Sequence, residues 1–240
     1  MKKIISLALL VLVVTSASFA QKKRVAVVTF YANKYIGTSN LSGGGTIAAI
    51  GELAENPNFN LESVVTNFHS TFFNDYAKSF PFDIVPESEV LSNEQYKSYR
   101  SSDTTGSRLF RPLMINGYNK LIVGILYKKD LKKMAEIFDV DGFLFVNLSY
   151  EFAPKLGIGG MGSAGISAYA DISLWTKDNN KVFRIYEYAT SKKSVGMVAG
   201  VPIIKLEKIL PMCEDASERL VKDLNKRLPK IVKKVSKKFS

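Results

Sequence analysis

The 240-residue chain is poor in the residues that build metal sites and disulfide frameworks. It has one Cys and one His, which excludes an intramolecular disulfide, a cysteine-rich metal site and a zinc site that needs a pair of histidines. Acidic residues are also few, with 22 Asp and Glu against 33 Lys and Arg. Apolar residues make up 46% of the chain and aromatic residues 11%, which excludes a chain that is disordered throughout.

The first twenty residues have the pattern of a cleaved export signal. Lys2 and Lys3 precede an apolar run at 4–14, and Ser18 and Ala20 suit the −3 and −1 positions of a signal-peptidase site. The run is too short for a spanning helix, which needs about 20 apolar residues. We therefore predict cleavage after Ala20 and a periplasmic protein, with association to the outer membrane as an option. No Cys lies directly after the run, since the only Cys is Cys213, so we do not expect a lipoprotein.

Positive charge is concentrated at the C-terminal end of the chain. Segment 219–240 contains nine Lys and Arg and one Asp, which gives a net charge of +8. Segment 21–218 contains 22 Lys and Arg and 21 Asp and Glu, which gives a net charge of +1. We therefore divide the chain into a signal peptide at 1–20, a single α+β domain at 21–218 and a basic amphipathic helix at 219–240 that extends this domain.

The hydrophobic pattern alternates between strands and helices. Short apolar runs predict strands, the last two of which form a hairpin, at 24–30, 82–85, 143–152, 166–175 and 182–190. Helical spacing predicts helices at 61–80 with Asn60 as N-cap, 87–91, 94–99, 130–138 and from about 205 onward, the last interrupted at Pro211 and Pro229. Loops are expected at 31–59, 101–106, 155–165 and 191–204, and 121–127 is compatible with a strand or a helix.

This order predicts an α+β fold of the α/β-sandwich kind. We expect a mixed sheet of about five strands with a C-terminal β-hairpin, helices packed on the sheet, and a long basic helix at the C-terminal end.

Four segments resemble a superfamily of bacterial envelope proteins. The segments are Val25–Phe30 (VAVVTF), Phe82–Glu87 (FDIVPE), Asp139–Phe143 (DVDGF) and the hairpin Ile172–Arg184. Together they are similar to the superfamily of the curli-secretion lipoprotein CsgG, the LpoB-type activators of penicillin-binding proteins and the N-terminal domain of TolB. The lipobox Cys of many relatives is absent, and the loop at 31–59 is long. The resemblance implies a non-enzymatic envelope protein that binds other proteins.

Two glycine-rich segments match nucleotide-binding patterns only in part. Gly157–Gly162 spells G-x-G-x-x-G, but a strand is predicted after it where the dinucleotide fingerprint requires a helix. We therefore interpret it as a flexible or close-packed connection between strands. Gly43–Ala48 matches G-x-G-x-x-A, lies thirteen residues beyond Phe30 and has no Lys after it. An anion cradle at its amides stays open as an alternative.

The remaining reactive side chains form no evident catalytic set. His69 lies one residue from the apolar face of the predicted helix, and we interpret it as a boundary or surface histidine. Cys213 is expected to be a buried or inert thiol. Asp139 and Asp141 flank a helix-to-strand turn, which favours capping over acid–base chemistry.

The basic segment is the most distinctive feature of the sequence. Apolar residues at helical spacing favour a helix that packs on the sheet, at Ala216, Leu220, Leu224, Leu228, Ile231, Val235 and Phe239. The cations form the candidate contact surface, and they are Lys226, Arg227, Lys230, Lys233, Lys234, Lys237 and Lys238. Lysines near a helix C-terminus also suit the helix dipole, which leaves a structural role open. The alternative is a surface for anionic lipid, lipopolysaccharide or an acidic partner.

These observations favour a non-enzymatic, exported envelope protein that serves as a protein-binding accessory or adaptor of an assembly or secretion complex. No cofactor or metal is predicted. Nucleic acid is not an expected partner, because export takes the protein away from the nucleic acid of the cell. Two alternatives stay open: a small-ligand or nucleotide-binding protein or enzyme that uses the glycine-rich loops, and a membrane-surface binder that uses the basic helix.

Overall fold

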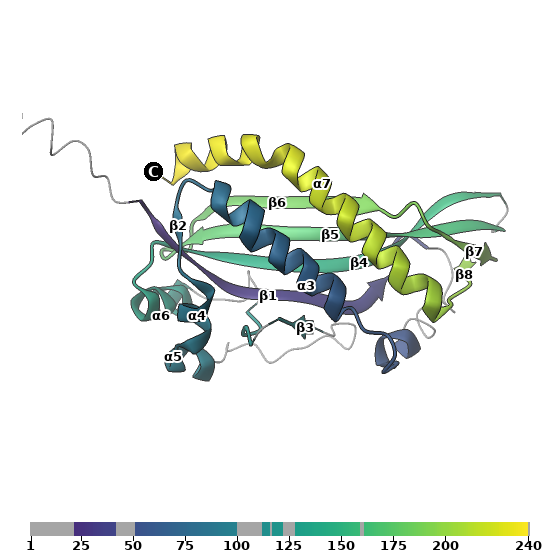
Figure 1. Cartoon of the computed structure of the whole chain (residues 1–240), viewed down its shortest axis with the longest axis horizontal. Helices are drawn as coiled ribbons and strands as arrows, with labels where there is room; N and C mark the ends of the chain where they lie inside the picture. The colour runs from purple at the N-terminus through teal and green to yellow at the C-terminus, as the bar shows by residue number, and fades with distance from the viewer. Residues whose placement is uncertain are drawn as a thin grey trace, which may run out of the picture.

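The structure is a computed structural model that describes residues 22–41, 51–99, 112–115, 117–121, 128–158 and 161–239. The predicted signal peptide, the Gly43–Ala48 motif and the loop at 101–106 lie outside these residues. The predicted fold class is confirmed, because a mixed sheet carries helices and a long helix ends the chain (Figure 1). The sheet has eight strands, three more than predicted, because short strands lie in segments that lack a strand-like pattern.

Four long strands make up most of the sheet. They are β1 (Arg24–Gly37), β4 (Gly142–Ile158), β5 (Met161–Thr176) and β6 (Lys181–Thr190). β1 pairs with β4 in parallel, and β4, β5 and β6 follow one another in antiparallel. The predicted β5–β6 hairpin is thus confirmed.

Four short strands complete the sheet. β2 (Asp83–Ile84) and β3 (Pro112–Met114) both pair with β1, in parallel and antiparallel respectively. β7 (Val195–Val198) pairs with the first residues of β5, and β8 (Val201–Pro202) pairs with β7.

Three predicted loops are wrong in part. β1 continues to Gly37, β4 and β5 extend into 155–165, and β7 and β8 form within 191–204. Glycine and polar residues in these segments weaken the local strand pattern. Pairing with a neighbouring strand of the sheet supplies the backbone hydrogen bonds that local composition does not indicate.

The helices follow the predicted order. They are α3 (Glu62–Thr71), which continues as a π-helical turn η1 (Phe72–Tyr76) and a 3₁₀ turn η2 (Ala77–Ser79), then α4 (Glu87–Ser92), α5 (Glu94–Ser98), α6 (Lys128–Phe138) and α7 (Leu206–Lys238). The N-cap position of α3 is Leu61 rather than Asn60. The Asn60 side chain instead accepts a hydrogen bond from the backbone N–H of Glu62 at 2.8 Å.

α3 and α7 lie side by side on one face of the sheet (Figure 1). The alternation predicted for β5 is confirmed, since five apolar side chains of this strand are buried on one face, at Ile166, Ala168, Ala170, Ile172 and Leu174.

α7 is one continuous helix, so the prediction that it is interrupted at two prolines is wrong. Pro211 and Pro229 both lie inside it. The helix bends in its C-terminal half (Figure 1), where Pro229 removes a backbone N–H donor. Val235 and Phe239 are buried beyond Pro229, and the Phe239 ring meets that of Phe82 edge to face with centroids 5.9 Å apart. The basic end of the helix is therefore docked on the domain.

Candidate interaction surfaces

Large apolar side chains are exposed together at one end of the sheet. The β4–β5 hairpin and the β7–β8 hairpin lie beside each other there (Figure 1). Exposed fractions in this group run from 47% to 92%. We call this surface the apolar end, and it consists of Leu156, Ile158, Met161, Val198 and Ile203. Exposed apolar residues grouped in this way indicate a contact with another molecule or a membrane.

The backbone geometry of the β4–β5 hairpin explains why glycine is frequent in it. Gly157 and Gly162 lie opposite each other in the ladder. A Cβ atom on Gly162 would collide with the carbonyl oxygen of Leu156 and would lie 2.6 Å from the Cα of Gly157. The prediction of a close-packed strand connection at Gly157–Gly162 is confirmed for the residues that the structure describes.

Lysines lie in the two segments that carry the apolar end. Segments 154–165 and 191–205 contain four Lys and no Asp or Glu. Lys192, Lys193 and Lys205 are exposed, and Lys155, a residue of β4, is half-buried. The Lys155 ammonium donates to the carbonyl oxygens of Lys192 and Lys193, at 2.7 and 3.0 Å, and so ties β4 to the connection between β6 and β7.

A second surface lies on the sheet face opposite α3 and α7. Tyr169 of β5 contacts two tyrosines of β6, with ring centroids 5.6 Å from Tyr186 and 5.3 Å from Tyr188. Tyr186 is 57% exposed and Tyr188 is 56% exposed. We call these three residues the tyrosine face. Burial and nearby Glu151 raise the pKa of both Tyr169 and Tyr186, so both phenols are neutral at physiological pH.

The tyrosine face borders a cleft of about 450 Å³ on the same side of the sheet. Arg184 makes two hydrogen bonds to the Asp171 carboxylate, from Nε at 2.7 Å and from Nη2 at 2.6 Å. Trp175 donates from Nε1 to the Ser173 hydroxyl at 3.2 Å. Burial, with the Asp171 carboxylate nearby, raises the pKa of Tyr31 to about 12. The cleft is thus polar and aromatic, and its carboxylate is already held by an arginine.

The basic helix divides into paired and unpaired cations. Lys226 forms an ion pair with Asp223 at 2.8 Å, and Arg227 forms one with Glu187 at 2.7 Å. These two of the seven predicted contact residues therefore have partners within the chain. The other five are exposed on the last turns of α7 and have no acidic partner in the part of the chain that the structure describes: Lys230, Lys233, Lys234, Lys237 and Lys238.

His69 is buried, so its interpretation as a boundary or surface residue is wrong. Its Nε2 lies 2.6 Å from Oε1 of Glu87, and its ring contacts Phe30 and Phe73 with centroids 4.9 and 4.8 Å away. Burial and the Glu87 carboxylate raise the pKa of Tyr118 beyond its ordinary range. The sequence pattern missed this arrangement because Glu87 lies 18 residues away, at the start of α4.

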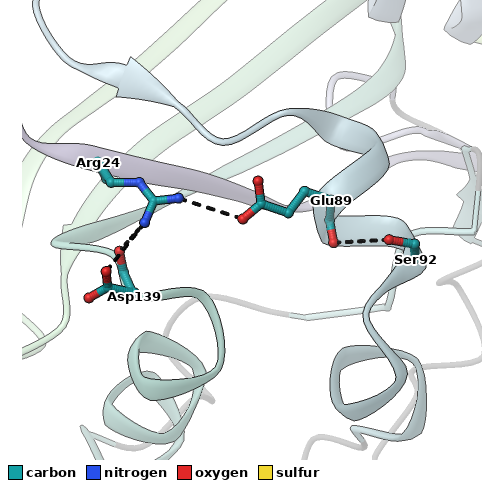
Figure 2. Close-up of polar contacts among 4 residues, drawn as sticks. All are labelled: Arg24, Glu89, Ser92 and Asp139. Atoms are coloured by element: carbon teal, nitrogen blue, oxygen red, sulfur yellow. Dashed lines mark hydrogen bonds and ion pairs between the residues drawn. The ribbon is translucent and has the colours of Figure 1, made fainter.

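Asp139 and Asp141 have structural contacts. The Arg24 guanidinium donates to the Asp139 carbonyl at 3.0 Å and reaches its carboxylate at 3.4 Å, while its other terminal nitrogen lies 3.5 Å from Glu89 (Figure 2). The Asp141 carboxylate accepts the Arg24 backbone N–H at 3.1 Å. These contacts join the start of β1 to α4 and to the end of α6.

The geometry supports neither a reactive role for Cys213 nor a metal site among the described residues. Cys213 is fully buried, as predicted, and burial raises the pKa of its thiol far above the usual value. Among the described residues, no group of three or more His, Cys, Asp and Glu side chains lies close enough to hold a metal ion. Within the same residues, no helix combines the length and the apolar character that crossing a membrane requires.

Sequence reasoning missed the apolar end and the tyrosine face. The first lies in segments interpreted as loops, although aliphatic residues without an acid nearby were a usable signal. The second follows from the outward positions of alternating residues in β6.

The comparisons with known proteins give no family. No family model and no curated protein matches the chain. Among solved structures, it is similar to the hypothetical protein CT253 from Chlamydia trachomatis, with 10% sequence identity and a TM-score of 0.39 over 88% of this chain and 98% of that one.

Proposed function

We propose that the protein is an exported, non-enzymatic adaptor of the bacterial envelope that binds another protein through its tyrosine face. The observation that carries the proposal is the position of Tyr186 and Tyr188. More than half of each side chain is exposed, and both rings pack against Tyr169. Tyrosine is enriched at protein interfaces because it combines a large apolar ring with a polar hydroxyl.

The strand that carries these tyrosines adds to the argument. β6 pairs with β5 and with no other described strand, so it forms an edge of the sheet. An exposed edge is a common place for a partner segment to add a strand. Ring packing within the tyrosine face also limits the side-chain entropy that binding would remove.

The remaining parts of the proposal come from the sequence. Export rests on the pattern of residues 1–20, and the envelope role rests on the resemblance to the CsgG, LpoB and TolB superfamily. Both stay predictions, and finding the mature N-terminus at Gln21 in the periplasmic fraction would support the first.

The test is an affinity capture from detergent-solubilised envelopes at low and high salt. We compare the mature protein with a Tyr186→Ala/Tyr188→Ala variant and with a matched control, Lys222→Ala/Asn225→Ala, on the exposed side of α7. We expect one stoichiometric partner that the control retains and the tyrosine variant loses. The same partner with all three proteins, or none, would refute the tyrosine face as the interface.

A membrane-surface role for the basic helix remains a second candidate. It is favoured by the five exposed lysines on the last turns of α7 that have no acidic partner among the described residues. Removing the helix would not test this candidate, because Leu220, Leu224, Val235 and Phe239 are buried in the core. Charge reversal of Lys230, Lys234 and Lys237 leaves those contacts in place, and the vesicle experiment below includes this variant.

A further inference from the structure

We propose that the apolar end inserts into the interfacial layer of an anionic lipid membrane. This inference does not rest on the adaptor proposal, because it concerns another surface and is tested with other variants. The apolar side chains belong to the ends of two neighbouring hairpins (Figure 1), and each of them is about half exposed or more. Ile158, the most exposed of them, has 92% of its surface accessible.

Backbone pairing makes insertion of these hairpins feasible. A peptide group that enters a lipid environment without a hydrogen-bond partner carries a large desolvation penalty. In the β4–β5 hairpin the ladder continues to the pair Ile158 and Met161. In the β7–β8 hairpin the two strands pair at Met197–Pro202 and Val198–Val201, and the Ile203 N–H donates to the Gly196 carbonyl at 2.8 Å.

Charge around the apolar end is complementary to anionic headgroups. Lys192, Lys193 and Lys205 are exposed in the segments that carry the aliphatic side chains, and segments 154–165 and 191–205 contain no Asp or Glu. One acid from α7, Asp215, accepts the backbone N–H of Lys192. A lysine stem packs along apolar surface while its ammonium reaches the headgroup layer. Basic residues near a membrane are attracted to anionic lipid, and the attraction falls off within a Debye length.

The composition favours lipid over a protein as the occupant. Protein interfaces concentrate their binding energy in tyrosine, tryptophan and arginine. Segments 154–165 and 191–205 contain none of these and no phenylalanine. Apart from Pro154 and Ser194, their exposed residues are aliphatic side chains, methionine, glycine and lysine, which match acyl chains below a layer of negative headgroups.

The experiment is co-sedimentation of the full mature chain with phosphatidylcholine vesicles, with and without phosphatidylglycerol, at low and high salt. We expect binding to the anionic vesicles that weakens as salt rises. Ile158→Ser/Met161→Ser should weaken it on the order of ten-fold or more, because it removes the inserted side chains. Lys193→Glu/Lys205→Glu should weaken it only where phosphatidylglycerol is present. The matched control Tyr186→Ser/Tyr188→Ser removes similar exposed surface elsewhere and should bind as the parent does.

A second measurement reports insertion directly. Trp175 is the only tryptophan, so Ile158→Trp in a Trp175→Phe background places a single indole at the apolar end. Its emission should shift to shorter wavelength with anionic vesicles and be quenched by brominated acyl chains. Three results would overturn the proposal. The first is no vesicle binding, and the second is vesicle binding that only the Lys230→Glu/Lys234→Glu/Lys237→Glu variant abolishes. The third is self-association in solution that Ile158→Ser/Met161→Ser removes, without binding to vesicles.

Discussion

The Tyr31 side chain is the clearest case of a residue whose ionisation depends on the fold. It is 7% exposed in the cleft below the tyrosine face, and its pKa is raised to about 12 by burial and by the Asp171 carboxylate. The fold thus favours the neutral phenol. Asp171 is in turn held by Arg184 through two short hydrogen bonds, which fixes the negative charge beside the phenol.

This shift makes stability depend on alkaline pH. Because the pKa of folded Tyr31 exceeds the ordinary value of 10, its contribution is complete below pH 10 and is lost as pH rises toward 12. A rise of the phenol pKa from 10 to about 12 corresponds to about 3 kcal/mol of stability for a fully buried group. We expect Tyr31→Phe to reduce the fall in unfolding free energy between pH 9 and pH 12 by about 1–3 kcal/mol. Urea unfolding across this range measures it, and an equal fall in both proteins would contradict it.

At the scale of elements, the β4–β5 hairpin depends on the absence of side chains at Gly157 and Gly162. Ala at position 162 would press against the opposite strand, and we expect Gly162→Ala to destabilise the protein by about 1–3 kcal/mol. The matched control is Gly51→Ala, in a helical segment where a Cβ meets no atom within 4 Å. That change should be neutral or stabilising by up to about 1 kcal/mol. Thermal unfolding of both variants is the measurement, and equal midpoints would count against the steric explanation.

The bend of α7 has a cause that can be tested at one exposed residue. Pro229 lacks the N–H that would bond to the carbonyl four residues earlier, and an internal proline costs a helix about 3 kcal/mol. We expect Pro229→Ala to raise the unfolding free energy by about 1–3 kcal/mol, provided that Val235 and Phe239 keep their buried positions. Urea unfolding measures the gain. A loss of stability would mean that the bend is needed to dock the end of the helix.

The elements show which features the sequence can predict. Periodic apolar residues predicted β5, β6 and the long C-terminal helix, because these elements bury one face against the core. Locally weak segments were not predicted: β7 is short and pairs with the start of β5, and β8 pairs in turn with β7. The part-buried His69–Glu87 pair was not predicted for the same reason, since contacts between distant segments leave no local pattern.

At the scale of the whole molecule, the apolar end and the basic end of α7 lie at opposite ends of the long axis (Figure 1). α7 has 33 residues, and a straight helix of that length spans about 50 Å. A molecule inserted by its apolar end would therefore hold Lys230 and the lysines beyond it away from the same membrane. Those lysines would then be available to an acidic partner rather than to the lipid that holds the protein.

Membrane-bound protein should accordingly have a defined orientation. Cys213 is fully buried, so a thiol introduced at an exposed position can be labelled selectively. We expect an environment-sensitive dye on Ile158→Cys to brighten on anionic vesicles and to be quenched by lipid-bound quenchers. The same dye on Ser236→Cys, near the end of α7, should keep its solution spectrum and stay accessible to a water-soluble quencher. Equal lipid quenching at both positions would mean that the molecule lies flat, with the basic helix and the apolar end sharing one membrane surface.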